Sequence, residues 1–225
     1  HYALLSIDIG SLPPTADIPG AQEGAITVKP VSAFLRKWQA LMHAAARSPV
    51  RIAVIGGGAA GVEILLSMQR RLAQAAPAAA ARFALVSDSP RLLAGHDAAV
   101  GAVFARTLRA RGIEVHLGSP VVQVQRGTVI TGNGQHIAAD AAVWATGAAA
   151  PRWLRDTGLA LAEDGFIAVN AHLQSLTHPE VFAAGDCATI AGMPLPKSGV
   201  YAVRQGPLLA ANLRHALRGR PLRTY

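Results

Sequence analysis

The stretch that decides the fold is residues 50–63, Val-Arg-Ile-Ala-Val-Ile-Gly-Gly-Gly-Ala-Ala-Gly-Val-Glu. Its apolar run 52–55 predicts a buried parallel strand that leads directly into a glycine-rich turn. Apolar residues then recur at helical spacing in Leu65, Met68 and Leu72. A strand, a Gly-x-Gly-x-x-Gly turn and a helix in this order are typical of a dinucleotide-binding site.

Each glycine of the turn has its own expected role. Gly56 permits the tight turn, Gly58 lets the backbone approach a pyrophosphate, and Gly61 lets the helix pack close to the strand. The helix N-terminus offers N–H groups and a positive dipole end to phosphates. We therefore expect Gly56, Gly58, Ala59, Ala60 and Gly61 to bind a pyrophosphate. The alternative is a glycine turn of a βαβ unit that holds no ligand.

The composition excludes several classes of protein. The 225 residues suffice for one large domain or two small ones, and no apolar run approaches the length of a membrane span. The single cysteine, Cys187, excludes an internal disulfide and a Cys-x-x-Cys redox pair. The histidines lack metal-ligand spacing, so no metal is expected.

The net charge of +8 comes mostly from arginine. No nucleic-acid-binding motif accompanies this charge, so we do not expect nucleic acid as a partner. Four arginines gather near the C-terminus, at 214, 218, 220 and 223. They indicate either a solvated helix face and tail or a contact with an anionic membrane surface.

The order of the remaining segments predicts an α/β fold. A strand at 82–86, an amphipathic helix and a strand at 113–117 complete a βαβαβ unit. We expect that helix to bury Val100, Val103, Phe104 and Leu108. Short alternating strands at 121–125, 128–131 and 135–137 then predict an antiparallel meander.

The segments before and after this region also contain predicted strands and helices. The sequence begins with His1 rather than methionine and opens in a strand-like run, so we expect a piece of a longer protein. A helix is predicted over 31–46. Strands are predicted at 166–169 and 181–183, with a last helix over 200–217.

Three segments together carry a family resemblance: the glycine turn 56–63, the Val-Trp-Ala-Thr-Gly run 143–147 that follows the meander, and Val-Phe-Ala-Ala-Gly-Asp-Cys at 181–187. They resemble the flavoproteins with two dinucleotide-binding domains, the pyridine nucleotide–disulfide oxidoreductase class. The resemblance implies a Rossmann-like NAD(P)-binding domain with a β-meander, inserted in a partial FAD-binding domain. It assigns 1–48 to the end of the first FAD segment and a linker helix, 49–150 to the NAD(P)-binding domain, and 151–225 to the returning FAD segment.

More narrowly, residues 197–210 resemble the segment near flavin and quinone in type II NADH dehydrogenases, and the related module joined to selenide, water dikinase in some bacteria. This implies an FAD-dependent NAD(P)H oxidoreductase that passes a hydride to FAD and then electrons to a quinone or similar acceptor. It implies a cytoplasmic location, peripheral on the inner membrane if quinone is the acceptor. Implied partners are the absent N-terminal FAD segment, selenide, water dikinase and a second copy of the chain. The alternative function is a nucleotide-binding sensor module without turnover.

The resemblance also assigns roles in the NAD(P)-binding part. It places Glu63 beside the nicotinamide and its ribose, although a carboxylate there also favours the helix dipole. The strand-end position that contacts the adenosine ribose is Ser87, with Asp88 one residue later. Asp88 either contacts the ribose or only caps the turn. Thr146 and Gly147 correspond to a motif beside bound nucleotide.

In the FAD-binding part, the resemblance places Gly185 and Asp186 at the ribityl–phosphate region of FAD. A helix cap is the alternative role for Asp186. Lys197 and Gln205 resemble positions on the flavin and quinone side and are the expected catalytic residues, together with Glu63. The FAD domain's own glycine motif would lie upstream of residue 1, so we expect the chain alone to be inactive.

Overall fold

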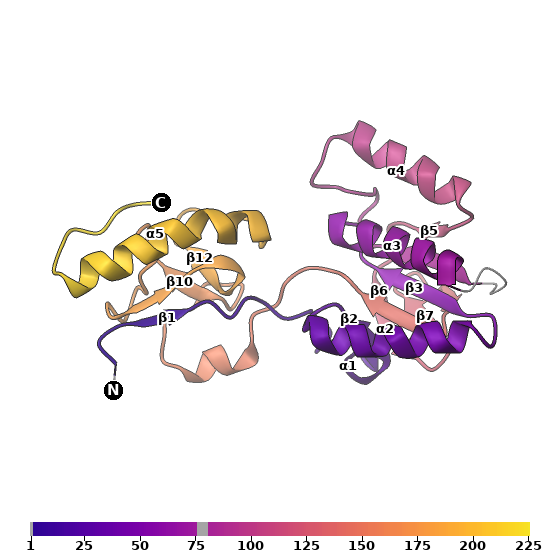
Figure 1. Cartoon of the computed structure of the whole chain (residues 1–225), viewed down its shortest axis with the longest axis horizontal. Helices are drawn as coiled ribbons and strands as arrows, with labels where there is room; N and C mark the ends of the chain where they lie inside the picture. Colours follow the sequence, from indigo (N-terminus) through magenta and orange to yellow (C-terminus); the bar gives the residue numbers. More distant parts are fainter. Residues whose placement is uncertain (1, 76–80) are drawn as a thin grey trace. The chain divides into compact units, whose positions relative to one another are not determined.

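The computed structural model describes residues 2–75 and 81–225, which form two compact units (Figure 1). One unit comprises Pro13–Gly147, and the other combines the N-terminal residues up to Leu12 with Ala148–Tyr225. Each unit has its own hydrophobic core. The α/β class predicted from the sequence is confirmed.

The unit Pro13–Gly147 is built on a parallel five-stranded sheet with the strand order β2-β9-β3-β4-β5. An antiparallel sheet β6-β7-β8 forms the predicted meander. The strands are β2 (Ala25–Thr27), β3 (Arg51–Ile55), β4 (Arg82–Val86), β5 (Glu114–His116), β6 (Val121–Gln125), β7 (Thr128–Thr131), β8 (His136–Ala138) and β9 (Ala141–Trp144). The helices are α1 (Ala21–Gly24), α2 (Val31–Ala45), α3 (Ala59–Ala75) and α4 (Ala98–Ala110).

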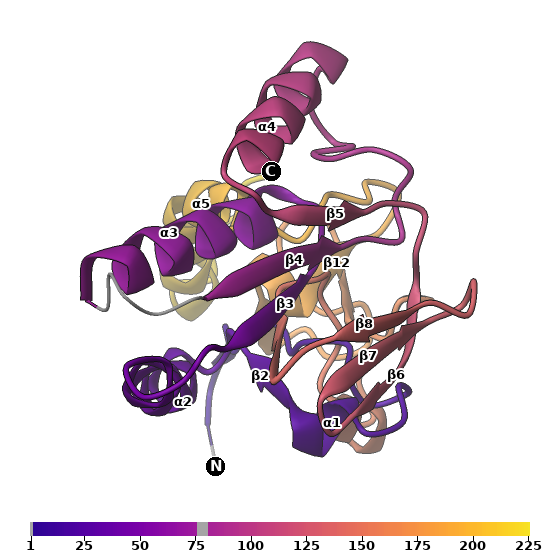
Figure 2. The same cartoon turned by 90° about the vertical axis from the view of Figure 1, so that its right-hand side faces the viewer.

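The parallel sheet is covered on both faces. Ile52 and Val54 of β3 pack into one core with residues of α3, whereas Ala53 and Ile55 pack into another core beneath the meander. Figure 2 shows α2 and α3 on one side of the sheet and β6–β8 on the other. Because alternate residues of a strand point to opposite faces, a strand buried on both faces becomes continuously apolar. This is the physical reason for the apolar run that precedes the glycine turn.

Two expectations about this unit were wrong. Residues 13–48 group with the glycine-turn unit rather than with the first twelve residues, because β2 pairs in parallel with β9. In α4, Val100 and Val103 are 38% and 48% exposed, while Leu108 is buried. The buried stripe of α4 is narrow and consists of Gly101 and Leu108, so the two valines face outward.

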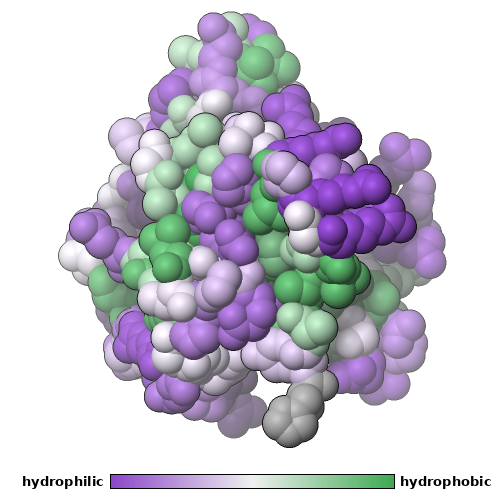
Figure 3. Space-filling model, turned by 90° about the vertical axis from the view of Figure 1, so that its left-hand side faces the viewer, coloured by the Kyte–Doolittle hydropathy of each residue, from purple (hydrophilic) through white to green (hydrophobic). Residues whose placement is uncertain are grey.

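The second unit contains two pairs of parallel strands, β1 with β11 and β10 with β12. Its elements are β1 (Leu5–Ile7), η1 (Arg152–Asp156), β10 (Ile167–Val169), β11 (Val181–Ala183), η2 (Gly185–Cys187), β12 (Ala188–Ile190) and α5 (Gly199–Leu217). Phe166 and Phe182 are almost fully buried in its core. In the view of Figure 3, hydrophobic side chains reach the surface in separate groups between hydrophilic ones.

The C-terminal tail is attached to the second unit by hydrogen bonds. The buried Asn212 donates to the carbonyl oxygens of His172 and Arg223, both at 2.9 Å, and accepts from the Arg223 N–H at 2.8 Å. The C-terminal arginines 214, 218, 220 and 223 are exposed. Among the described residues, no helix combines the length and apolar character needed to cross a bilayer.

Candidate functional site

The glycine turn lies between the end of β3 and the start of α3, and two of its glycines are required by close backbone contacts. Gly56 has a φ of 129°, and a Cβ there would come within 2.5 Å of the Ala145 carbonyl oxygen. A Cβ on Gly61 would overlap the carbonyl oxygen of Gly56. These contacts hold α3 and the end of β9 close to β3, as the motif predicts.

Gly58 differs from its neighbours because a Cβ there would meet no atom within 4 Å. Gly58, Ala59 and Ala60 are exposed, and the first turn of α3 carries no acidic residue. The first N–H groups of a helix lack acceptors within the helix, and the helix dipole adds partial positive charge there. The open side of this turn therefore fits a pyrophosphate group.

The loop after β4 packs against this turn. Ser87 is 3% exposed, and a Cβ built on Gly57 would lie 2.6 Å from its Oγ. The Ser87 Oγ also accepts a hydrogen bond from the Ser89 N–H at 3.2 Å. Asp88 is exposed and makes no side-chain hydrogen bond in the described part of the chain. The Ser87 side chain is thus packed against the glycine turn and hydrogen-bonded to Ser89, whereas the carboxylate of Asp88 is accessible to solvent.

The remaining candidate residues of this unit lie beside the same turn or on α3. Thr146 and Gly147 follow β9, and the Thr146 nitrogen would lie 3.1 Å from a Cβ on Gly56. Glu63 is exposed on α3, but it is the fifth residue of the helix rather than part of its first turn. The structure thus brings the glycine turn, Ser87 and Thr146 together at the carboxyl ends of β3, β4 and β9. This edge is where ligands bind in open α/β sheets.

The second unit contains the other four candidate residues, Gly185, Asp186, Lys197 and Gln205. Gly185 adopts a φ of 72° and donates its N–H to the Gln205 Oε1 at 2.6 Å. Asp186 accepts a hydrogen bond from the Ser11 Oγ at 3.1 Å through its Oδ2. Gln205 and Ser11 therefore hold the turn that carries the Asp186 carboxylate.

The Lys197 ammonium is bound within the same unit. Its Nζ donates to the Ala188 carbonyl oxygen and to the Thr189 Oγ1, both at 2.7 Å. It lies 4.0 Å from the centre of the Phe166 ring and 3.8 Å from an oxygen of Asp164. Burial lowers the pKa of Lys197, and the nearby Asp164 carboxylate acts in the opposite direction. These contacts give Lys197 a structural role in joining the loop before α5 to β12.

Cys187 does not have the environment of a nucleophile. Its side chain is buried, and its Sγ lies 3.1 Å from the carbonyl oxygens of Ile7 and Ala184. Burial raises the pKa of the thiol, which keeps it protonated and unreactive near neutral pH. Within residues 2–75 and 81–225, no group of three His, Cys, Asp or Glu side chains could hold a metal ion.

Two partners of the candidate residues were not found from the sequence. Ser11 lies 175 positions before Asp186, and no local pattern links them. Gly57 is the unassigned position of the glycine motif, yet its missing side chain makes room for Ser87. Both depend on long-range packing, for which a single sequence contains no direct signal.

Known proteins are similar to this chain in sequence. The family described as pyridine nucleotide-disulphide oxidoreductase matches residues 5–206. A type II NADH:quinone oxidoreductase of Haemophilus influenzae is 27% identical over 187 residues, covering 78% of this chain and 42% of that protein. A demethylphylloquinone reductase of Synechocystis sp. is 26% identical over 227 residues, covering 97% of this chain and 55% of that protein. The chain spans about half the length of the curated relatives it matches.

Solved structures show the same fold. The water-forming NADH oxidase of Lactobacillus brevis, bound to NADH, is 25% identical with a TM-score of 0.77; the match covers 100% of this chain and 48% of that one. A reduced CoADR-RHD protein of Bacillus anthracis is 24% identical with a TM-score of 0.79 and is covered over 39% of its length.

Proposed function

The chain belongs to the pyridine nucleotide-disulphide oxidoreductase family, and on that premise we propose that it forms part of an FAD-dependent NAD(P)H oxidoreductase. NAD(P)H binds to the unit Pro13–Gly147, at the glycine turn. The observation that carries this proposal is the open side of Gly58, at the N-terminus of α3, whereas a Cβ on Gly56 or Gly61 would meet backbone atoms and a Cβ on Gly57 would meet the Ser87 side chain. The whole protein binds FAD partly through the second unit.

Each candidate residue of the nucleotide unit has a distinct task in this proposal. The N–H groups around Gly58, Ala59 and Ala60 bind the pyrophosphate. The exposed Asp88 accepts hydrogen bonds from the adenosine ribose, since Ser87 is already packed beneath the turn. Glu63 and the Thr146–Gly147 segment contact the nicotinamide half of the ligand.

In the second unit, the Asp186 carboxylate suits the hydroxyl groups of the FAD ribityl chain, and Ser11 orients it. FAD, when bound, accepts a hydride from NAD(P)H and transfers electrons onward. Gln205 acts by holding the Gly185 N–H, and Lys197 acts by holding β12, so both are positioning residues for that cofactor. The protein thus supplies binding and orientation rather than covalent chemistry.

We propose a quinone as the electron acceptor of the whole protein. The support is that two curated relatives are described as a type II NADH:quinone oxidoreductase and a demethylphylloquinone reductase. A quinone acceptor favours peripheral contact with the inner-membrane surface, to which the exposed C-terminal arginines can contribute. Association with selenide, water dikinase is a further proposal that depends only on the resemblance of residues 197–210.

A segment of the whole protein is proposed to complete the second unit. An apolar groove of about 510 Å³ lies beside β1 and is lined by residues that include Tyr2, Ile9 and Trp153. These three side chains are half or more exposed. Because the curated relatives are about twice as long as this chain, we propose that the remaining FAD-domain segment covers this groove. A second copy of the chain is the alternative occupant.

A nucleotide-binding sensor without turnover is the second candidate function. It is favoured by the observation that all the residues proposed to bind the nucleotide belong to one unit, Pro13–Gly147, whereas those proposed to bind flavin belong to the other. The test is NADH oxidation by the whole protein, purified with bound flavin, in the presence of a soluble quinone. Turnover that disappears when the flavin is removed supports the oxidoreductase. Nucleotide binding without flavin reduction supports the sensor.

A further inference from the structure

A cavity lined by both polar and apolar side chains lies in the unit Pro13–Gly147, away from the glycine turn. Its volume is about 580 Å³, and the sheet strands β3, β4 and β5 line it together with β8 of the meander. Such a volume is in the range of small-molecule sites. The side chains of its floor are short or apolar, including Ala84 and Ile137.

Strand register explains why polar groups gather in this cavity. Arg51 pairs with Arg82, and Ala84 pairs with Glu114 across the parallel strands. Register partners point to the same face of a sheet, and alternate residues of one strand do so as well. Arg51, Arg82, Glu114 and His116 therefore share the face that the meander covers, where the alanines leave space.

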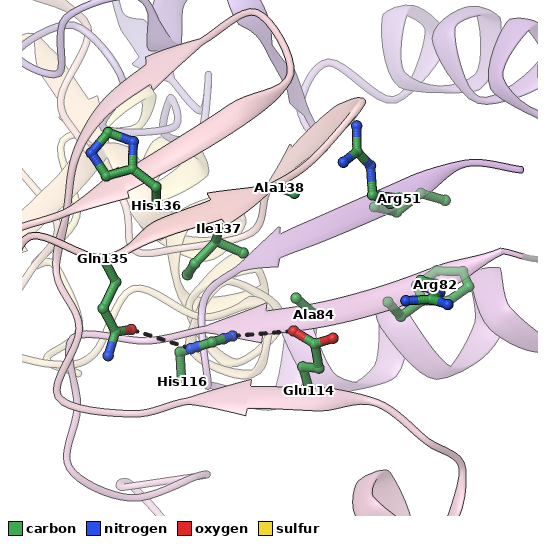
Figure 4. Close-up of a pocket in the computed structure, with 11 residues that line it drawn as sticks. Arg51, Arg82, Ala84, Glu114, His116, Gln135, His136, Ile137 and Ala138 are labelled. Carbon is green, nitrogen blue, oxygen red and sulfur yellow. Dashed lines mark hydrogen bonds and ion pairs between the residues drawn. The ribbon is translucent and has the colours of Figure 1, made fainter.

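Charge is distributed unevenly along the cavity. Figure 4 shows Gln135, His116 and Glu114 in a row, with Arg51 and Arg82 at the other end. The Arg51 guanidinium is already bound to Asp140, at 2.7 and 3.1 Å. Arg82 makes no side-chain hydrogen bond or ion pair within residues 2–75 and 81–225. Its guanidinium is thus available for an external anion.

The opposite end of the cavity has an unsatisfied polar atom. His116 Nδ1 lies 3.3 Å from the Gln135 Oε1, which fixes the imidazole ring. The other ring nitrogen, Nε2, is buried, has no hydrogen-bond partner in the described part of the chain, and lies 3.7 Å from a Glu114 oxygen. A buried polar atom without a partner costs free energy that a bound hydroxyl or amine would recover.

We propose that this cavity binds a small polar molecule with an anionic group, either carboxylate or phosphate, and a hydroxyl or amine at its other end. The anion pairs with Arg82, and the hydroxyl or amine hydrogen-bonds His116 Nε2 and the Glu114 carboxylate. Arginine suits this role because its planar donors match carboxylate and phosphate oxygens. The site is on the meander-covered face of the sheet, whereas the nucleotide binds at the glycine turn. It is therefore independent of the proposed function.

The test is isothermal titration calorimetry of the protein with two probes: 4-hydroxybutyrate, which carries a carboxylate and a hydroxyl group at opposite ends, and inorganic phosphate. Phosphate can also bind the glycine turn, so both titrations are repeated with Gly58→Val, whose side chain occupies the open side of that turn. At least one probe should bind both to the unaltered protein and to Gly58→Val. The probe that binds identifies whether the ligand's anionic group is a carboxylate or a phosphate. Arg82→Gln should weaken that binding about tenfold, since a charge-assisted hydrogen bond is lost.

The matched control is Arg106→Gln on α4, an exposed arginine outside the cavity. It should leave probe affinity unchanged. His116→Phe removes both ring nitrogens, and it should weaken 4-hydroxybutyrate more than phosphate, because only 4-hydroxybutyrate can place a hydroxyl group beside His116 while its anionic group pairs with Arg82. Failure of both probes to bind at millimolar concentration would overturn the proposal. Equal losses in Arg82→Gln and Arg106→Gln would also overturn it, because they would show a nonspecific charge effect.

Discussion

The side-chain oxygen of Gln205 accepts a hydrogen bond from the backbone N–H of Gly185 at 2.6 Å, although the two residues are 20 positions apart. Gln205 is 4% exposed, so water does not readily replace it. The bond joins α5 to the turn that carries Asp186. It gives Gln205 a structural role that can be tested without any cofactor.

Replacing Gln205 with methionine keeps the length of the side chain but removes the acceptor. We expect the variant to lose about 1–3 kcal/mol of unfolding free energy, because the Gly185 N–H is left without its partner. Chemical denaturation measures this change. Gln39→Met on an exposed position of α2 is the matched control and should stay within about 0.5 kcal/mol of the unaltered protein. An equal effect of both substitutions would contradict the assigned role.

Cys187 provides a clean test of the core of the second unit, because it is the single cysteine of the chain. Its burial and its raised pKa should protect it from thiol reagents near pH 8. We expect labelling only after the protein is unfolded in guanidinium, as monitored by mass spectrometry. Rapid labelling of the folded protein would show that the thiol is accessible, which would contradict its burial in the core of the second unit.

The ion pair between Arg51 and Asp140 should make stability depend on pH. The hydrogen bond from Arg51 holds the pKa of Asp140 below its ordinary value. The carboxylate therefore stabilises the folded protein above about pH 4, the ordinary range of aspartate, and this contribution is lost as pH falls through the lowered pKa. Asp140→Asn should unfold at a lower temperature than the unaltered protein at pH 7. The difference should shrink in acid; a difference that is constant with pH would contradict the ion pair.

Choice between NADH and NADPH should depend on Asp88. Ser87 is packed beneath the glycine turn, so the exposed Asp88 is the carboxylate placed to repel a 2′-phosphate. We expect a modest preference for NADH, which Asp88→Ala should narrow. Binding titrations with both nucleotides measure the ratio of the two affinities. A large preference that survives the substitution would place the discrimination elsewhere.

Local patterns were sufficient to predict the β3–α3 unit and the meander, because apolar periodicity and turn glycines occur within short stretches of sequence. They did not predict the pairing of β2 with β9, since three residues of strand contain no information about their partner. The exposure of Val100 and Val103 was missed for a related reason: how wide a helix face is buried depends on the tertiary packing around it. The Ser11–Asp186 and Gly185–Gln205 contacts also join distant segments.

The central claim is that a nicotinamide nucleotide binds at the glycine turn. The most direct test is titration of NADH into the unaltered protein and into Gly58→Val, with thermal unfolding as the check of folding. A side chain at Gly58 meets no protein atom within 4 Å, so this variant should fold normally. It should nevertheless bind NADH at least about tenfold more weakly, because the side chain occupies the space of the pyrophosphate. A folded Gly58→Val protein that binds NADH with unchanged affinity would contradict the account.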